Sequence, residues 1–352
     1  MIHFESDYLE GAHEKILARL AETNLEQTVG YGEDAHCARA GALIAEAVGD
    51  PDAYVQFLVG GTQTNLIVLS ALLRPWEGVL CADTGHINCH ETGAIEAAGH
   101  KVLALPGTNG KITAAQVEAA VRTYEADPTQ EHIVKPAAVY ISFPTELGSL
   151  YSKAELFELH EICRAAGIPL FIDGARLGYG LAAEGCDVTL EDIYRLSDVF
   201  YIGGTKVGAL FGEAVVFHPE TPHAGFRNLM KQRGGMLAKG RLLGIQFEVL
   251  FEGGKDRLYD RIAAHADRLA LKLRDGLLAL GVPFSAESPT NQQFPILRNE
   301  ILDVLSKKYG IQLMGPRGET ETPVRFCTSW ATKEEHVDAL LADMKALWTK
   351  QD

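Results

Sequence analysis

One segment of the chain, GGTQTN at residues 60–65, has the composition of a phosphate-binding turn. It follows an apolar run and opens a helix-like stretch. A glycine-rich turn at a helix start leaves backbone N–H groups free at the positive end of the helix dipole, which suits a phosphate. The pattern is neither a Walker A sequence nor GxGxxG, and a tight strand-to-helix turn without any ligand has the same composition. By itself it is therefore a weak indication.

Two ionisable residues stand at the ends of apolar runs further along the chain. Asp173 ends the run PLFID, and Lys206 follows the run VFYIG and two glycines. A carboxylate that ends a buried strand is costly unless it is paired, and an ion pair with Arg176 would be one structural explanation. A lysine in apolar surroundings has a lowered pKa and a nucleophilic amine, whereas an isolated lysine after a strand is more often simply exposed.

The combination of these three features is more specific than any one of them. A phosphate-binding turn, an aspartate at a strand end and a later lysine are the parts that a pyridoxal 5′-phosphate site needs. The lysine forms a Schiff base with the cofactor, and the aspartate keeps a proton on the pyridine nitrogen so that the ring can accept electrons. The sequence therefore predicts pyridoxal phosphate as the cofactor.

Short apolar runs alternate with longer helical patterns in the chain up to Phe217. In Ser152–Ala166, apolar residues recur at three- and four-residue spacing, and Ser152 followed by Glu155 is a capping-box start. The alternation predicts a mostly parallel sheet covered on both faces, with ligands at the carboxyl ends of its strands. The predicted strands are Tyr54–Val59, Val79–Asp83, Lys101–Leu105, Ala137–Phe143, Pro169–Asp173, Val199–Gly203 and Ala214–Phe217.

The pattern changes after Phe217, where the strand signal fades into a long helical region interrupted by two glycine pairs. An α+β tail with an amphipathic last helix follows. We place a domain boundary near Gly253, between a large domain and a smaller C-terminal domain. The helical region is Phe226–Leu280 with glycines at 234–235 and 253–254, the tail strands lie near Gln293–Leu297 and Val324–Thr328, and the last helix is Lys333–Lys350.

Composition and charge narrow the classes of partner. The 352 residues carry 32 Lys and Arg against 47 Asp and Glu, a net charge of −15, which argues against a nucleic-acid or anionic-membrane partner. The six cysteines form no CxxC pair and indicate reduced thiols of a cytoplasmic protein. No segment has 18 apolar, uncharged residues in a row, and the first residues lack the pattern of a signal peptide.

Several longer motifs, spread over nearly the whole chain, resemble one family. They are FESDY at 4–8, YGED at 31–34, GGTQTN, GHINCHETGAI at 85–95, IDGARL at 172–177, GGTK at 203–206 and VRFCTSW at 324–330. The sequence resembles the low-specificity L-threonine aldolases, within the aromatic β-eliminating lyase superfamily. The resemblance implies an α/β fold of the aspartate-aminotransferase type, with a three-layer, mainly parallel seven-stranded sheet. It also implies an N-terminal segment 1–14 that joins the small domain and the active site, a cofactor-binding domain 15–252 and a small α+β domain 253–352.

The resemblance assigns a role to each matching residue. The cofactor is held through Lys206 as the Schiff-base lysine, Asp173 at the pyridine nitrogen, Gly61, Thr62 and Asn65 at the phosphate, and Arg176 and His86 near the ring. His86 stacks on the ring and is a candidate for proton transfer with the substrate hydroxyl. The substrate carboxylate is bound by Ser6, Arg176 and Arg325. Arginine suits that task because its planar guanidinium meets a carboxylate bidentately.

The implied activity is retro-aldol cleavage of L-threonine, L-allo-threonine and related L-β-hydroxy-α-amino acids to glycine and an aldehyde. The implied assembly is a homodimer or homotetramer with shared active sites. Two alternatives stay open within the same cofactor chemistry, a β-eliminating lyase and an aminotransferase. A third, a non-catalytic protein of this fold, is disfavoured because structure alone does not require Lys206, Asp173 and Arg325 together.

Two segments depart from the family pattern. Many members carry an Asn-Thr-His element in the stretch that this chain reads as Phe143–Ser152, which holds no histidine, so a histidine near the substrate is missing and the general base is not identified. Members also carry an arginine that reaches a neighbouring subunit's phosphate where this chain has Leu237. Arg233, Lys239 or Arg241 could replace that arginine.

Two further patterns, the His86–His90–Glu91 cluster and the position of Arg325, each allow two interpretations. His86, His90 and Glu91 could seat a metal on one helix face, but the family role of the histidine favours a site without metal. Arg325 alternates with apolar Val324 and Phe326, so it is expected to face the cleft if they face a core. The alternative for Arg325 is an ion pair with a nearby acidic side chain, Glu319 or Glu321.

Overall fold

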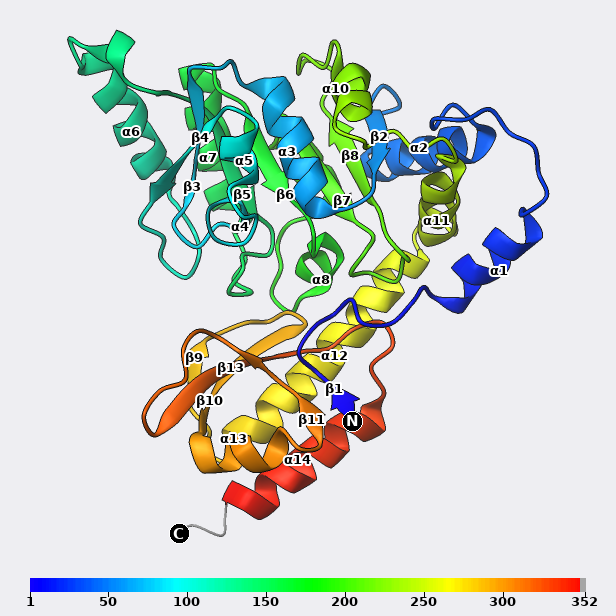
Figure 1. Cartoon of the computed structure of the whole chain (residues 1–352), viewed down its shortest axis with the longest axis vertical. Coiled ribbons are helices and arrows are strands. Elements are labelled where there is room, and N and C mark those ends of the chain that lie inside the picture. Colours follow the sequence, from blue (N-terminus) through cyan, green and yellow to red (C-terminus); the bar gives the residue numbers. More distant parts are fainter. Residues whose placement is uncertain (349–352) are drawn as a thin grey trace.

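The computed structural model describes residues 1–348, which form a large α/β part and a smaller α+β part joined by one long helix (Figure 1). That helix, α12 (Leu258–Ala279), runs from the large part into the small one. The N-terminal strand β1 (Ile2–His3) lies in the small part, next to segments from the other end of the chain. The first residues therefore pair with the small part rather than with the sheet of the large part.

The large part is built on a seven-stranded sheet of order β2-β8-β7-β6-β5-β3-β4. All neighbouring strands are parallel except β8, which is antiparallel to both β2 and β7. Each of the seven strands predicted from the sequence is confirmed within two residues. Their bounds are β2 (Tyr54–Leu58), β3 (Glu77–Ala82), β4 (Lys101–Leu105), β5 (Lys135–Ser142), β6 (Leu170–Asp173), β7 (Val199–Gly203) and β8 (Glu213–Phe217).

Helices cover both faces of this sheet because its strands are apolar on both sides. Along β5, Val139 and Ile141 belong to one core, whereas Ala138 and Tyr140 belong to the other. The second core is closed by α3 (Gly61–Leu72), α4 (His86–Cys89), α5 (Ala94–Ala97) and α10 (Phe226–Gln232). The first is closed mainly by α1 (Glu14–Glu22), α2 (Ala35–Val48), α6 (Ala114–Ala126), α7 (Lys153–Ala166), α8 (Leu177–Ala182), α9 (Leu190–Arg195) and α11 (Arg241–Phe251). A short 3₁₀ turn, η1, spans Gln130–His132.

Local signals in the sequence account for several of these boundaries. The capping box at Ser152 and Glu155 starts α7, with both reciprocal hydrogen bonds present. The two glycine pairs separate α10, α11 and α12, as predicted. The last helix, α14 (Glu334–Trp348), matches the prediction up to Trp348, and the predicted end at Lys350 lies outside the described residues.

The small part has its own core around a four-stranded antiparallel sheet of order β12-β13-β10-β9. In α12, residues up to Ala266 belong to the core of the large part and residues from Leu269 onward belong to the small one. The boundary at 252/253 stays a prediction. The remaining elements are β9 (Phe284–Ala286), β10 (Gln292–Arg298), α13 (Asn299–Leu305), β11 (Tyr309–Gly310), which pairs with β1, β12 (Gln312–Leu313) and β13 (Glu321–Cys327).

Candidate active site

A cavity of about 290 Å³ lies at the carboxyl ends of β3, β5, β6 and β7. Its wall includes most of the residues predicted from the sequence: Gly61, Thr62, His86, Asp173, Arg176 and Lys206. Asn65 lies behind Asp173. Ser6 and Arg325 lie outside the lining, and Arg325 donates to the carbonyl of Glu5, the residue before Ser6. Chain segments more than a hundred residues apart in sequence therefore meet at one edge of the sheet, where ligands of parallel α/β folds bind.

Asp173 is the most heavily hydrogen-bonded side chain of the cavity wall, although it is only 5% exposed. Tyr140 Oη and Tyr201 Oη each donate to its carboxylate at 2.5 Å, and Asn65 Nδ2 donates at 3.0 Å. Burial raises the pKa of Asp173, but the positive charge of His86 and the two tyrosine hydrogen bonds lower it below its ordinary value. The carboxylate is thus held ionised inside the protein.

Lys206 carries an amine without a hydrogen-bond or ion-pair partner among the described residues. Its Nζ lies in the cavity wall, and the carbonyl of the same residue accepts a hydrogen bond from Tyr179 Oη. Burial and the charge of Arg176 lower the pKa of Lys206, and nearby carboxylates offset this only in part. An unpaired amine with a lowered pKa is poised to form a covalent bond with a carbonyl group.

The start of α3 opens onto the same cavity. Gly60 is its N-terminal cap, no side chain caps this end, and Gly61 and Thr62 line the cavity. A Cβ atom built on Gly60 would meet nothing within 4 Å, so there is room for a ligand against the backbone. Free N–H groups at the positive end of a twelve-residue helix fit a phosphate.

His86 is held by two carboxylates on the wall opposite Lys206. Its Nδ1 donates to Glu91 Oε1 at 2.8 Å, and its backbone N donates to Glu146 Oε1 at 2.8 Å. Burial lowers the pKa of His86, yet the hydrogen bond to Glu91 and the charge of Asp173 raise it above its ordinary value. The imidazole is therefore fixed in orientation and favours its protonated form. Within residues 1–348, no three His, Cys, Asp or Glu side chains are arranged to hold a metal ion.

The ion pair between Arg176 and Asp173 that the sequence allowed is not formed, because Arg176 pairs with Asp7 instead. Arg176 Nε donates to Asp7 Oδ2 at 2.6 Å and Nη2 donates to Oδ1 at 2.9 Å. Asp7 is fully buried, and Asn291 Nδ2 also donates to it at 2.9 Å. Asp173 has no need of an ion pair, because tyrosine, amide and backbone donors already satisfy it.

Asn65 also differs from its predicted contact with a phosphate. It is fully buried, and its Nδ2 donates to Glu91 Oε1 at 2.7 Å as well as to Asp173. The amide therefore lies against two carboxylates, one helical turn below the open end of α3. This position orients Asp173 and Glu91 and lies outside the cavity lining.

Arg325 has no carboxylate partner in the described part of the chain. Its Nη1 donates to Gln292 Oε1 at 3.1 Å and its Nη2 donates to the carbonyl of Glu5 at 3.2 Å, so the expected alternative, an ion pair with Glu319 or Glu321, is wrong. Val324 and Phe326 lie in the small core, which confirms the alternation along β13. Arg325 Nε is buried without a hydrogen-bond partner, and so is the hydroxyl of Ser6, the residue after Glu5.

Four side chains, three in the cavity wall and Tyr140 behind Asp173, are given no role by the sequence. Tyr140 and Tyr201 occur inside strands, where an aromatic residue is ordinarily part of a core. Glu213 starts β8 and accepts hydrogen bonds from Thr205 Oγ1 at 2.8 Å and Gly204 N at 3.1 Å. Glu146 lies in the stretch Phe143–Ser152, for which the sequence indicates only that a histidine is missing. The signal that could have found Glu213 is a carboxylate beginning an otherwise apolar strand, which is costly without partners.

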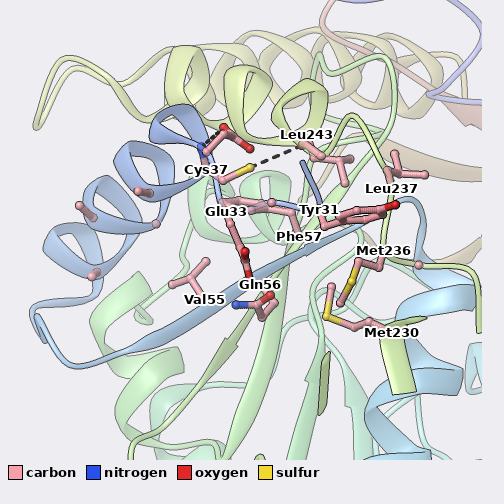
Figure 2. A pocket seen from close by; sticks show the side chains of 18 of the residues that line it. Tyr31, Glu33, Cys37, Val55, Gln56, Phe57, Met230, Met236, Leu237 and Leu243 are labelled. Atoms are coloured by element: carbon pink, nitrogen blue, oxygen red, sulfur yellow. Dashed lines mark hydrogen bonds between the residues drawn. The ribbon is translucent and has the colours of Figure 1, made fainter. Parts of the chain in front are cut away.

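A second cavity, of about 420 Å³, is lined by α2, β2, α11 and the loops at 31–34 and 235–240 (Figure 2). Leu237 and Tyr31 point into it, and Cys37 Sγ donates to the carbonyl of Gly240 (Figure 2). Arg241 is bound within its own chain, since its guanidinium donates to the carbonyls of Thr23 and Asn24. The other two candidates for the missing arginine, Arg233 and Lys239, are exposed.

Comparisons with solved structures place this fold. The chain superposes on Thermus thermophilus aspartate aminotransferase with a TM-score of 0.73 at 15% identity, over 99% of this chain and 91% of that one. It superposes on the Leishmania major threonine aldolase with a TM-score of 0.95 at 45% identity, over 99% and 100% of the two chains. The fold and the site together define a pyridoxal-phosphate enzyme of the aspartate-aminotransferase type.

Comparisons with protein sequences narrow that class. A family profile described as beta-eliminating lyase matches residues 3–299. A Pseudomonas protein named low specificity L-threonine aldolase is 31% identical over 98% of this chain and 97% of its own length, and one from Pseudomonas aeruginosa is 30% identical over 97% and 96%. The chain therefore belongs to the β-eliminating lyase family, in its group of low-specificity L-threonine aldolases.

The Asp7–Arg176 pair generates a prediction about stability. Burial raises the pKa of Asp7, but Arg176, Lys206 and Asn291 lower it to about 2. A lowered carboxyl pKa stabilises the fold above the ordinary value of 3.8, and this contribution is lost as pH falls toward 2. Asp7→Asn leaves Arg176 without its counter-charge and is expected to lower the free energy of unfolding by about 3–5 kcal/mol, measured by denaturant titration of cofactor-free protein.

The matched control for Asp7→Asn is Arg122→Ala, which removes an exposed ion pair with Glu118 on α6. Such a pair contributes about 0–1 kcal/mol, so this variant should unfold like the wild type. Equal stability of Asp7→Asn and Arg122→Ala would contradict the importance of the buried pair.

Proposed function

We propose that the protein cleaves L-threonine, L-allo-threonine and related L-β-hydroxy-α-amino acids to glycine and an aldehyde. One observation carries the proposal: Lys206, unpaired and with a lowered pKa, shares a cavity with the ionised Asp173, in a chain of the low-specificity L-threonine aldolase group. The reaction is that of a carbon–carbon lyase. A β-eliminating lyase or an aminotransferase is the alternative that the same cofactor chemistry allows.

The residues of the cavity fit pyridoxal phosphate. When bound, the cofactor supplies a conjugated ring that can accept the electron pair of the Cα–Cβ bond. Lys206 would bind its aldehyde carbon, Asp173 its ring nitrogen, and the backbone N–H groups of Gly61 and Thr62 its phosphate. His86 would lie against the ring. Asn65 acts through Asp173, which it orients by a hydrogen bond.

The substrate carboxylate would be bound where the N-terminal segment meets β13. Arg325 offers a guanidinium that no described carboxylate neutralises, and Ser6 offers a hydroxyl without a partner beside it. A carboxylate clamped there would fix the rotation of the substrate about its N–Cα bond, and so determine which bond of Cα can break. Arg176 keeps a role only through the N–H groups that Asp7 leaves free.

The free thiols and the net charge support a cellular compartment and a class of partner. The six cysteines are free, which supports a reducing compartment such as the cytoplasm. No described helix is both long and apolar enough to span a membrane. With a net charge of −15, the partners we propose are an amino-acid substrate and further copies of the chain, rather than nucleic acid or membrane.

We further propose a homodimer or homotetramer with shared active sites. Arg233 and Lys239 flank the loop that carries Leu237, and both are exposed and available to a neighbouring subunit. Either could supply the positive charge that the family places at position 237. Symmetric closed assemblies are also the common case among soluble enzymes.

The activity itself is tested with purified holoenzyme and L-threonine or L-allo-threonine. We expect glycine and acetaldehyde in equal amounts, measured by chromatography and an aldehyde assay. Lys206→Ala should form neither product and should keep its circular dichroism spectrum, because the amine supports no part of the fold. Release of ammonia with a 2-oxo acid would instead support β-elimination, and a 2-oxo acid with the amino group kept on the cofactor would support transamination.

The carboxylate clamp is tested by Arg325→Ala. We expect kcat/KM for L-threonine to fall at least about a hundredfold, because a desolvated contact with the substrate is lost. The bound cofactor, measured by its absorbance, and the thermal midpoint should stay close to the wild type. Arg325→Lys should restore activity only in part, since an ammonium cannot meet a carboxylate bidentately.

Arg317→Ala is the matched control for Arg325→Ala. Arg317 also lies in the small part, where it pairs with the exposed Asp303. Its loss should leave kcat/KM unchanged. Loss of the cofactor rather than of substrate turnover in Arg325→Ala would show that the carboxylate role is wrong.

A further inference from the structure

Glu146 is a carboxylate of the cavity wall that the roles described so far do not use. Its Oε1 accepts hydrogen bonds from Ser142 Oγ at 2.7 Å and from His86 N at 2.8 Å. No hydrogen bond from another described residue reaches Oε2, and this oxygen is not among the enclosed unpartnered atoms. The residue lines the same cavity as Lys206 and Asp173. One oxygen is therefore anchored and the other is open to a ligand.

The turn that carries Glu146 is well braced. Thr145 N donates to the carbonyl of Ser149 at 2.9 Å, and Gly148 N donates to the carbonyl of Thr145 at 2.8 Å. The hydroxyl groups of Thr145 and Ser149 also bond to each other at 2.8 Å. A carboxylate fixed by its own turn and by two donors has little freedom to lose when a substrate binds.

Glu146 is better suited than His86 to accept a proton. His86 gives its Nδ1–H to Glu91 and has a raised pKa, so it favours a form that donates. Burial raises the pKa of Glu146, as does the charge of Asp173, while the hydrogen bond from Ser142 lowers it; the result lies above the ordinary carboxyl value. A carboxylate with a raised pKa is a stronger base.

The other ionisable groups around Glu146 leave this assignment intact. Asp173 is an ionised carboxylate whose oxygens already accept hydrogen bonds. The side chains of Tyr140, Tyr151 and Cys81 stay protonated, because burial raises the pKa of each. The titratable groups that face Glu146 are His86, Asp173, Tyr140, Tyr151 and Cys81.

We propose that Glu146 is the general base of the cleavage step and that its Oε2 accepts the proton of the substrate β-hydroxyl group. The inference rests on the proposed function, and it identifies the group that replaces the histidine absent from this segment. In the step, the O–H bond breaks and its proton moves to Glu146, while the C–O bond becomes the carbonyl of the aldehyde. The Cα–Cβ bond breaks and its electron pair stays with Cα, which is later protonated to give glycine. Glu146 then returns its proton to water.

Glu146→Gln tests the proposal because it is nearly isosteric. The amide oxygen can still accept from Ser142 and His86, but the side chain can no longer take a proton. We expect kcat for L-threonine cleavage to fall by about a hundred- to ten-thousandfold. Exchange of the glycine α-proton with deuterated water, followed by NMR, involves no β-hydroxyl group and should stay within about threefold of the wild type.

The pH profile gives a second readout. In the wild type, kcat/KM should fall on the acid side as Glu146 is protonated, and Glu146→Gln should lose that limb. Glu146→Asp, which keeps a carboxylate, should keep the limb and recover part of the rate. An infrared titration of cofactor-free protein should show one buried carboxyl group that is absent from Glu146→Gln, independently of any activity.

Three results would overturn the proposal. Full cleavage activity in Glu146→Gln would do so directly. An equal loss of cleavage and glycine exchange would show that Glu146 only positions His86. A wild type that exchanges the glycine proton but cleaves no β-hydroxy amino acid would refute the proposed function, and the general base with it. The proposal is supported only if Glu146→Gln loses cleavage activity and still exchanges the glycine α-proton.

Discussion

The negative charge of Asp173 is the constraint on which the rest of the site depends. An ionised carboxylate this deeply buried is stable only where several donors converge on it. The strand order supplies them, because β5 and β7 flank β6 and carry Tyr140 and Tyr201 to either side of its last residue. Helix α3 adds Asn65 from the covering layer. The topology that packs two apolar cores thus also prepares a fixed negative charge at the cavity, where the ring nitrogen of a cofactor can meet it.

The buried ion pair between Asp7 and Arg176 connects the N-terminal segment to this sheet edge. The N-terminal segment packs Phe4 into the small core, places Asp7 against Arg176 and gives the carbonyl of Glu5 to Arg325. Three residues of FESDY thus contact the small core, the large part and the candidate substrate arginine. Because α12 also contributes to both cores, the two parts are linked by packing as well as by charge. This packing holds Arg176 in the cavity wall and Arg325 against the N-terminal segment.

The sequence predicts those parts of the fold that local patterns determine. Strands with apolar runs, the capping box of α7 and the glycine breaks around α11 are all local, and so is the placement of Asp173 and Lys206 after strands. What could not be predicted depends on long-range pairing. The partner of Arg176 lies 169 positions away, and nothing near Asp7 indicates it. Tyr140, Tyr201 and Glu146 look like core or turn residues, because only the sheet order brings the two tyrosines to Asp173 and Glu146 to the cavity. The reversed direction of β8 likewise follows from pairing rather than from composition.

The claim that Asp173 is ionised and holds a proton on the cofactor can be measured without turnover. Holoenzyme reconstituted with pyridoxal phosphate labelled with ¹⁵N in its ring reports the protonation of that nitrogen through its NMR chemical shift. The account predicts a protonated ring nitrogen in the wild type at neutral pH and an unprotonated one in Asp173→Asn, which keeps the shape of the side chain but not its charge. An unprotonated ring nitrogen in the wild type, or the same shift in both proteins, would contradict it.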